Sequence, residues 1–148
     1  MSREHERQTV IAHFLSVWLT ADGEVAIMNQ PFTTPLNELF ADVKIVETGT
    51  FRKSLGRTFI KRHNGVLQVD LYSPFGTGVA KSRQIADRLE DVYEELILPV
   101  PGTVESIKFG TPSSSRLATN VQRAENLDDN WDRYTFQAPY YRDQYVEK

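Results

Sequence analysis

The chain has 148 residues, a net charge of −3, 40% hydrophobic residues and 25% charged residues. This length suits one domain with a core of its own, and the composition excludes a largely disordered chain. The chain contains no cysteine, which excludes disulfides and cysteine–zinc sites, and the negative net charge argues against sequence-independent binding of nucleic acid.

The start of the chain predicts neither a signal peptide nor a membrane anchor. Residues 1–7 are too polar for a signal peptide, and the apolar stretches are only a few residues long. We therefore expect a soluble protein.

The first predicted element is a helix over residues 3–21. Apolar residues recur there at helical spacing, and Asp22-Gly23 ends the pattern. A short apolar run over 25–28 follows, and the two prolines of 29–35 predict an extended loop.

A β-hairpin is the clearest local pattern in the next part of the chain. Residues 57–63 and 66–72 are predicted strands, because Asn64-Gly65 between them is the dipeptide that a two-residue type I′ turn prefers. A strand over 43–47 and a loop over 48–56 precede this hairpin.

The C-terminal half begins with a second predicted helix. Its apolar stripe spans residues 79–97, and Pro99 and Pro101 end it. Strands are predicted over 104–109 and 131–138, whereas residues 110–116 resemble a linker in composition and 139–148 form an aromatic and charged tail.

This order of elements predicts an α+β fold. We expect two main helices packed on one face of a mostly antiparallel β-sheet, with a mixed sheet as the alternative. Residues 1–148 then form a single domain with a flexible segment near 110–130.

Motifs for chemistry are incomplete in this chain. A P-loop requires glycine directly before its lysine, but Ala80 precedes Lys81. A calcium loop beginning at Asp128 would require glycine at its sixth position and glutamate at its twelfth, but these positions hold Arg133 and Pro139. We therefore predict no catalytic, cofactor-binding or metal-binding residues, and no enzyme activity.

Aromatic and basic residues in predicted loops, at the first residues of predicted strands and in the predicted C-terminal tail are candidates for a protein interface, where both kinds are enriched. The candidates are Phe51, Arg52, Lys53, Arg57, Phe75, Trp131, Tyr140 and Tyr141. The alternative is that they anchor their own loops. Basic residues cluster at 52–57 and acidic residues at 87–95, and two such patches could steer neighbouring copies into a head-to-tail contact.

The segment GVLQVDLYSPFGTG lies at residues 65–78 and is followed by Ala86-Asp87 and Tyr93. In this segment and these residues, the chain resembles phage and prophage minor tail proteins of the tail-terminator type. The segment PFTTP at residues 31–35, after an N-terminal helix, is similar to the same family. The resemblance covers roughly residues 8–97 of the chain.

This resemblance implies a small α+β domain that forms a homo-oligomeric ring, usually hexameric. The ring caps the tail tube, ends its polymerisation and provides the surface that joins the head. Its partners are other copies of itself, the major tail tube protein and a head-completion protein. The family implies no catalytic residue and no cofactor. It implies a location in the virion tail, and in the host bacterial cytoplasm during assembly.

Three other functions remain open from the sequence. One is a head-completion or connector protein on the other side of the same joint. Another is a small enzyme or ligand-binding domain that uses the loop at Gly76–Gly78, and the third is a bacterial regulatory module.

Overall fold

The computed structural model describes residues 3–19, 22–28, 30, 38–74, 80–116 and 131–147. Within these residues, two helices and seven strands follow one another as α1 (Arg3–Val17), β1 (Glu24–Ile27), β2 (Phe40–Arg52), β3 (Thr58–Pro74), α2 (Ala80–Tyr93), β4 (Ile97–Pro99), β5 (Ser106–Phe109), β6 (Ser113–Arg116) and β7 (Trp131–Glu147). The predicted α+β class is confirmed. Neither helix is long and apolar enough to span a membrane.

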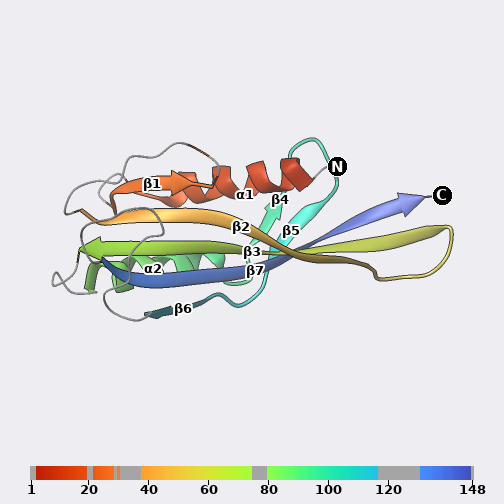
Figure 1. Ribbon diagram of the computed structural model, residues 1–148. Helices are drawn as coiled ribbons and strands as arrows, with labels where there is room; N and C mark the ends of the chain where they lie inside the picture. The colour runs from red at the N-terminus through yellow and green to blue at the C-terminus, as the bar shows by residue number, and fades with distance from the viewer. Residues whose placement is uncertain are drawn as a thin grey trace.

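The strands form one mixed sheet (Figure 1). Its order is β1-β2-β3-β7-β5-β4, and β6 pairs with the part of β7 that β5 leaves free. The parallel pair is β1–β2, whereas β3 and β7, which flank α2 in sequence, pair antiparallel. A parallel pairing across the second helix, which the sequence left open, is therefore not formed.

The predicted hairpin at Asn64-Gly65 is wrong. Residues 58–74 form one continuous strand, and neither turn residue has the positive φ that a type I′ turn requires. The hairpin instead joins β2 to β3 through residues 53–57, where Gly56 has a φ of 116°. Gly65 serves a different purpose, because a Cβ atom there would lie 2.5 Å from Cζ and Oη of Tyr140 on β7.

Other predicted boundaries also differ from the structure. The loop predicted over 48–56 is largely strand, because β2 continues to Arg52. The predicted tail after residue 138 belongs to β7, and β6 occupies part of the predicted linker. Residues 117–130, where most of the flexible segment was expected, lie outside the described residues.

Helix α2 ends earlier than the apolar stripe predicted. It stops at Tyr93, and Glu95 adopts a left-handed φ of 54°. That conformation turns the chain toward β4, whose pairing with β5 replaces the last predicted helical turn.

The core is one apolar cluster to which both helices and one face of the sheet contribute residues. Leu67, Val69 and Leu71 of β3 are fully buried there, as the alternation of this segment predicted. They belong to one apolar cluster with Phe14 of α1 and Leu89 of α2. The same face of β2 and β7 supplies further members of the cluster, since the paired residues of an antiparallel sheet point to the same side.

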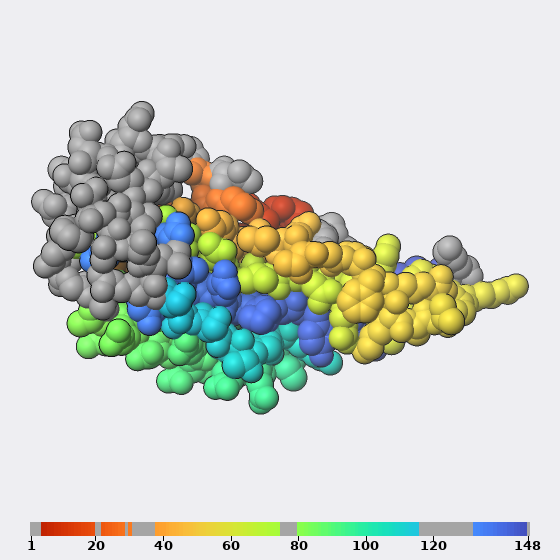
Figure 2. Space-filling model, turned by 60° about the horizontal axis from the view of Figure 1, so that its bottom comes forward, coloured from red at the N-terminus to blue at the C-terminus, as the bar shows by residue number. Residues whose placement is uncertain are grey.

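Three strands extend beyond this body as a narrow projection, which we call the arm. It consists of residues 46–64, which contain the β2–β3 hairpin, and residues 141–147 of β7. Figure 1 shows the strands running on past the helices, and Figure 2 shows the arm as a tapered extension of the molecule.

Candidate assembly interface

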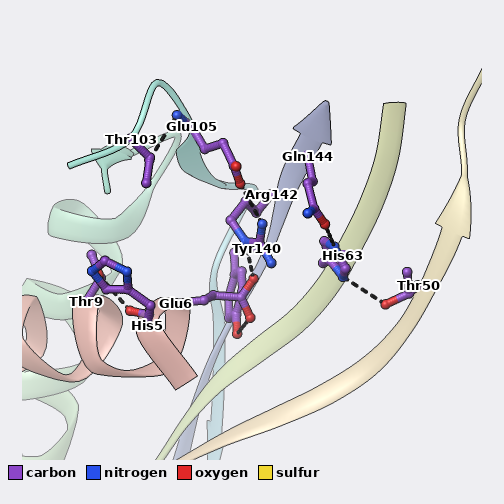
Figure 3. Close-up of polar contacts among 10 residues, drawn as sticks. All are labelled: His5, Glu6, Thr9, Thr50, His63, Thr103, Glu105, Tyr140, Arg142 and Gln144. Atoms are coloured by element: carbon purple, nitrogen blue, oxygen red, sulfur yellow. Dashed lines mark hydrogen bonds and ion pairs between the residues drawn. The ribbon is translucent and has the colours of Figure 1, made fainter. Parts of the chain in front are cut away.

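The base of the arm is fixed by a buried ion-pair cluster (Figure 3). Arg142 of β7 is fully buried and donates to Glu6 of α1 at 2.9 Å and to Glu105, just before β5, at 2.6 Å. Tyr140 donates its hydroxyl to the same Glu6 at 3.3 Å. One arginine therefore joins a helix and a loop to the strand from which the arm projects.

A histidine links all three strands of the arm near this base. His63 of β3 lies between Gln144 of β7, at 2.8 Å from Nε2, and Thr50 of β2, at 2.9 Å from Nδ1 (Figure 3). The amide oxygen of Gln144 only accepts, so Nε2 of His63 carries the proton and donates. In the neutral ring Nδ1 then accepts from the Thr50 hydroxyl. These bonds stiffen the arm across its width.

The face of the arm opposite to the helices carries a second polar group. Arg62 makes a bidentate pair with Asp143, with distances of 2.8 and 2.9 Å, and its guanidinium lies 3.9 Å from the ring centroid of Tyr141. Hydrogen bonding to Arg62 lowers the pKa of the Asp143 carboxyl below its ordinary value. The carboxylate is thus held ionised across β3 and β7.

The arm also displays apolar side chains that its own chain leaves uncovered. Leu55 at the tip is 89% exposed, Tyr145 is 65% exposed, Phe51 is 51% exposed and Val46 is 41% exposed. The strand register places Val46, Phe51 and Tyr145 on the helix-free face. A surface of this kind on a projecting element is typical of a contact with another protein.

Basic side chains surround the exposed tip. Arg52 donates to the carbonyls of Ser54 and Gly56 within the connecting loop. Arg57 and Lys61 are exposed and have no acidic partner in the described part of the chain. The tip therefore combines exposed apolar surface with uncompensated positive charge.

Acidic side chains line the outer side of α2 and the turn after it. Asp87, Asp91, Glu94 and Glu95 are exposed, and none of them has an ionic partner within the described ranges. Glu90 differs, because it accepts a hydrogen bond from Ser114 of β6 at 2.8 Å. The monomer thus carries free charges of opposite sign on two separate elements.

The structure gathers five of the eight predicted interface residues on the arm. Four of them, Phe51, Arg52, Lys53 and Arg57, lie in or next to the loop that joins β2 to β3, and the fifth is Tyr141. Tyr141 is half-buried at the base of the arm, between Arg62 and Lys108, whose ammonium lies 6.0 Å from the ring centroid.

The other candidates lie elsewhere. Tyr140 is only 3% exposed and packs in the core, so the prediction that it lies in a free tail is wrong. Phe75 and the side chain of Trp131 lie outside the described residues.

Leu55, Val46 and Tyr145 were not among the interface candidates chosen from the sequence. Their signal was weak, because a single leucine in a predicted loop is ordinary. The strand pairing is needed to show that Val46 and Tyr145 share one face with Phe51.

Among the hollows lined by the described residues, two lie on the body. One, of about 460 Å³, lies between α1 and the β4 region, and the other, of about 300 Å³, lies over β6, β7 and Gln68. Within the described residues, no group of three or more histidine, aspartate or glutamate side chains is placed to hold a metal ion.

An α+β body with a stiffened arm of exposed apolar and cationic side chains has the features of a protein that acts through contacts with other proteins. The chain belongs to the phage tail terminator family: the family model described as phage tail terminator protein matches residues 7–125. This is a family of structural proteins, and membership gives the chain a role in phage tail assembly, with tail and head components as the family's partners.

Similarity in three dimensions extends over the whole chain. A solved structure is similar to this chain, with a TM-score of 0.63 and 22% sequence identity over 100% of this chain and 99% of that chain. At this identity the similarity shows the fold. No curated protein sequence matches the chain.

Proposed function

We propose that this protein forms a ring on the end of the phage tail tube, where it ends tube polymerisation and presents the surface that joins the head. The ring is hexameric, as the family resemblance implies, and its protomer is a single domain. Its partners are the tube protein on one side and a head-completion protein on the other. Assembly takes place in the host cytoplasm, and the ring then remains in the virion tail.

The observation that carries this proposal is the arm. It offers exposed apolar and basic side chains at one end of the monomer, while free acidic side chains lie on α2. Two unlike surfaces on one chain favour a head-to-tail contact, which closes into a ring when the rotation between neighbours permits. Such a ring has two different faces, as a cap that accepts the tube and refuses further tube subunits requires.

Both helices contribute to one core cluster on one face of the sheet, and His13 of α1 bonds Tyr93 of α2 at 3.1 Å. We infer that the helices form one layer on that face. The arm strands then extend past this layer, which leaves their opposite face available to a partner.

The test is deletion of the gene from the phage or prophage that encodes it, followed by electron microscopy of the particles. We expect tails of uncontrolled length without heads, and normal tails when the wild-type gene is supplied. Phe51→Asp should fail to restore normal tails. Leu15→Asp, the same kind of change at an exposed apolar residue of α1, should restore them.

Tails of normal length beside unjoined heads would contradict the terminator role. That outcome would favour the head-completion function instead.

A further inference from the structure

We propose that the arm tip of one copy docks into the groove between α1 and the β4 region of the next copy, with Leu55 and Phe51 as the inserted side chains. This inference rests on the proposed ring and names the contact that closes it.

The groove is open to solvent and has the size of a receiving site, with apolar residues and the sides of polar residues in its lining. Its lining comes from His5, Gln8, Thr9, Ala12, His13, Leu98, Pro99 and Pro101. Its volume of about 460 Å³ lies within the range of about 300–1,000 Å³ that is typical of ligand pockets. The groove therefore has room for one or two large apolar side chains.

The walls of the groove are held in place from behind. His13 bonds the hydroxyl of buried Tyr93 at 3.1 Å, which ties α1 to the end of α2. On the other wall, Val100 is buried and its amide donates to the carbonyl of Glu105. A preformed groove loses little conformational freedom when it is filled, which favours binding.

The arm tip supplies side chains that fit this groove. Leu55 is 89% exposed and Phe51 is 51% exposed. Strands β3 and β7 pair without a break from the body to the tip, and His63 ties the arm across its width. A stiff arm that points away from the body does not fold back into the groove of its own chain (Figure 1). A second copy is the occupant that the geometry favours.

Charge complementarity supports the same pairing. Arg57 and Lys61 lie beside the arm tip and are free of acidic partners in the described chain. Glu94 and Glu95 directly follow Tyr93, whose ring meets His13 of the groove at a centroid distance of 5.3 Å. Docking of the tip would bring these opposite charges together at the rim, where they aid encounter and orientation.

Engineered cysteines test the contact directly, since the chain has no cysteine of its own. Leu55→Cys combined with Ala12→Cys should give, on oxidation at high protein concentration and on isolated tails, a ladder of covalent oligomers that stops at the ring size. Leu55→Cys with Pro101→Cys should do the same. Leu55→Cys with Ser115→Cys, on exposed β6, is the matched control and should give no ladder.

Leu55→Asp should weaken self-association, measured by sedimentation, by about tenfold or more, as expected for a central apolar anchor. Leu15→Asp should leave it unchanged. Rings that form normally from Leu55→Asp protein, or a ladder as strong in the Ser115 control, would overturn the docking and leave the proposed function standing. A wild-type chain that is monomeric both in solution and on tails would overturn both.

Discussion

Gly65 illustrates how one residue type can serve two structural purposes. In a type I′ turn glycine is chosen for positive φ, whereas in β3 it makes room for the ring of Tyr140. That ring is held on the neighbouring strand, with its hydroxyl bonded to Glu6. The local sequence Asn-Gly is the same in both situations, and only the strand opposite distinguishes them.

Gly65→Ala should therefore destabilise the fold by about 1–3 kcal/mol, because the added methyl group overlaps a buried ring that has little room to move. Urea unfolding measures the change. Gly110→Ala is the matched control, because the nearest atom to a Cβ placed there lies at 3.8 Å. This variant should lose far less unfolding free energy. Equal losses in both variants would mean that Tyr140 moves aside freely.

The buried pair of Arg142 and Glu6 gives a second prediction at this scale. Glu6→Ala removes one of the two carboxylates that compensate a fully buried guanidinium, and should cost about 3–5 kcal/mol of unfolding free energy. Glu4→Ala, an exposed change two residues away on the same helix, should cost about 0.5 kcal/mol or less. Denaturant unfolding at neutral pH compares the unfolding free energies of the two variants.

Among the elements, β3 and α2 form the centre of the core. Leu71→Ala and Leu89→Ala should each cost about 2–5 kcal/mol, because both side chains are fully buried in the same cluster. Asp91→Ala on the outer side of α2 should cost about 0.5 kcal/mol or less. Thermal or urea unfolding distinguishes the buried positions from the outer side of α2. Similar losses of unfolding free energy in all three variants would contradict this packing.

The arm has its own pH dependence through Asp143. Arg62 lowers the folded pKa of this carboxyl, so its contribution is present above the ordinary aspartate pKa of about 3.9 and is lost as the pH falls through the lower folded value. We expect Asp143→Asn to destabilise the protein by about 1 kcal/mol near neutral pH, since the pair is bidentate and mostly buried. The difference between variant and wild type should begin to shrink as the pH falls below about 4, and it should vanish only below the lower folded pKa. A difference that persists there would assign the loss to packing.

The sequence predicted elements well where periodicity is local and poorly where long-range pairing decides. The alternation of Leu67, Val69 and Leu71 correctly placed one face of β3 in the core. The strand over residues 57–63 was predicted as well, but its continuation through Asn64-Gly65 was not, because those two residues pair with Tyr141 and Tyr140, more than seventy positions away. Once β7 lies alongside, the turn preference of Asn64-Gly65 is overridden.

The interface itself stays a prediction: residue type selected the basic loop and Phe51 as candidates, and the fold was needed to show which candidates are exposed. Tyr140 and Tyr141 are neighbours in the sequence, yet a strand sends them to opposite faces, one into the core and the other toward Arg62. Composition alone treats the two tyrosines alike.

At the scale of the whole molecule, free charges on the arm and on α2 should make self-association sensitive to salt. Arg57→Glu with Lys61→Glu should weaken oligomers in sedimentation, and Glu94→Lys with Glu95→Lys should restore them when combined with the first pair. Association of the wild type should fall as salt rises, since the Debye length is about 8 Å at physiological ionic strength. Indifference to salt and to charge reversal would mean that apolar contact alone holds the copies together.

The unbroken pairing of β3 with β7 also has a mechanical consequence. The ladder runs from Pro74–Trp131 in the body to Thr58–Glu147 at the arm tip. A pull on the tip along the arm loads the hydrogen bonds of this ladder together in shear, instead of opening them one at a time like a zipper. In a ring held by such arms, tension passes from copy to copy along strands that also form each core. In such a ring we would expect the contact between copies to yield to force before the subunit itself unfolds.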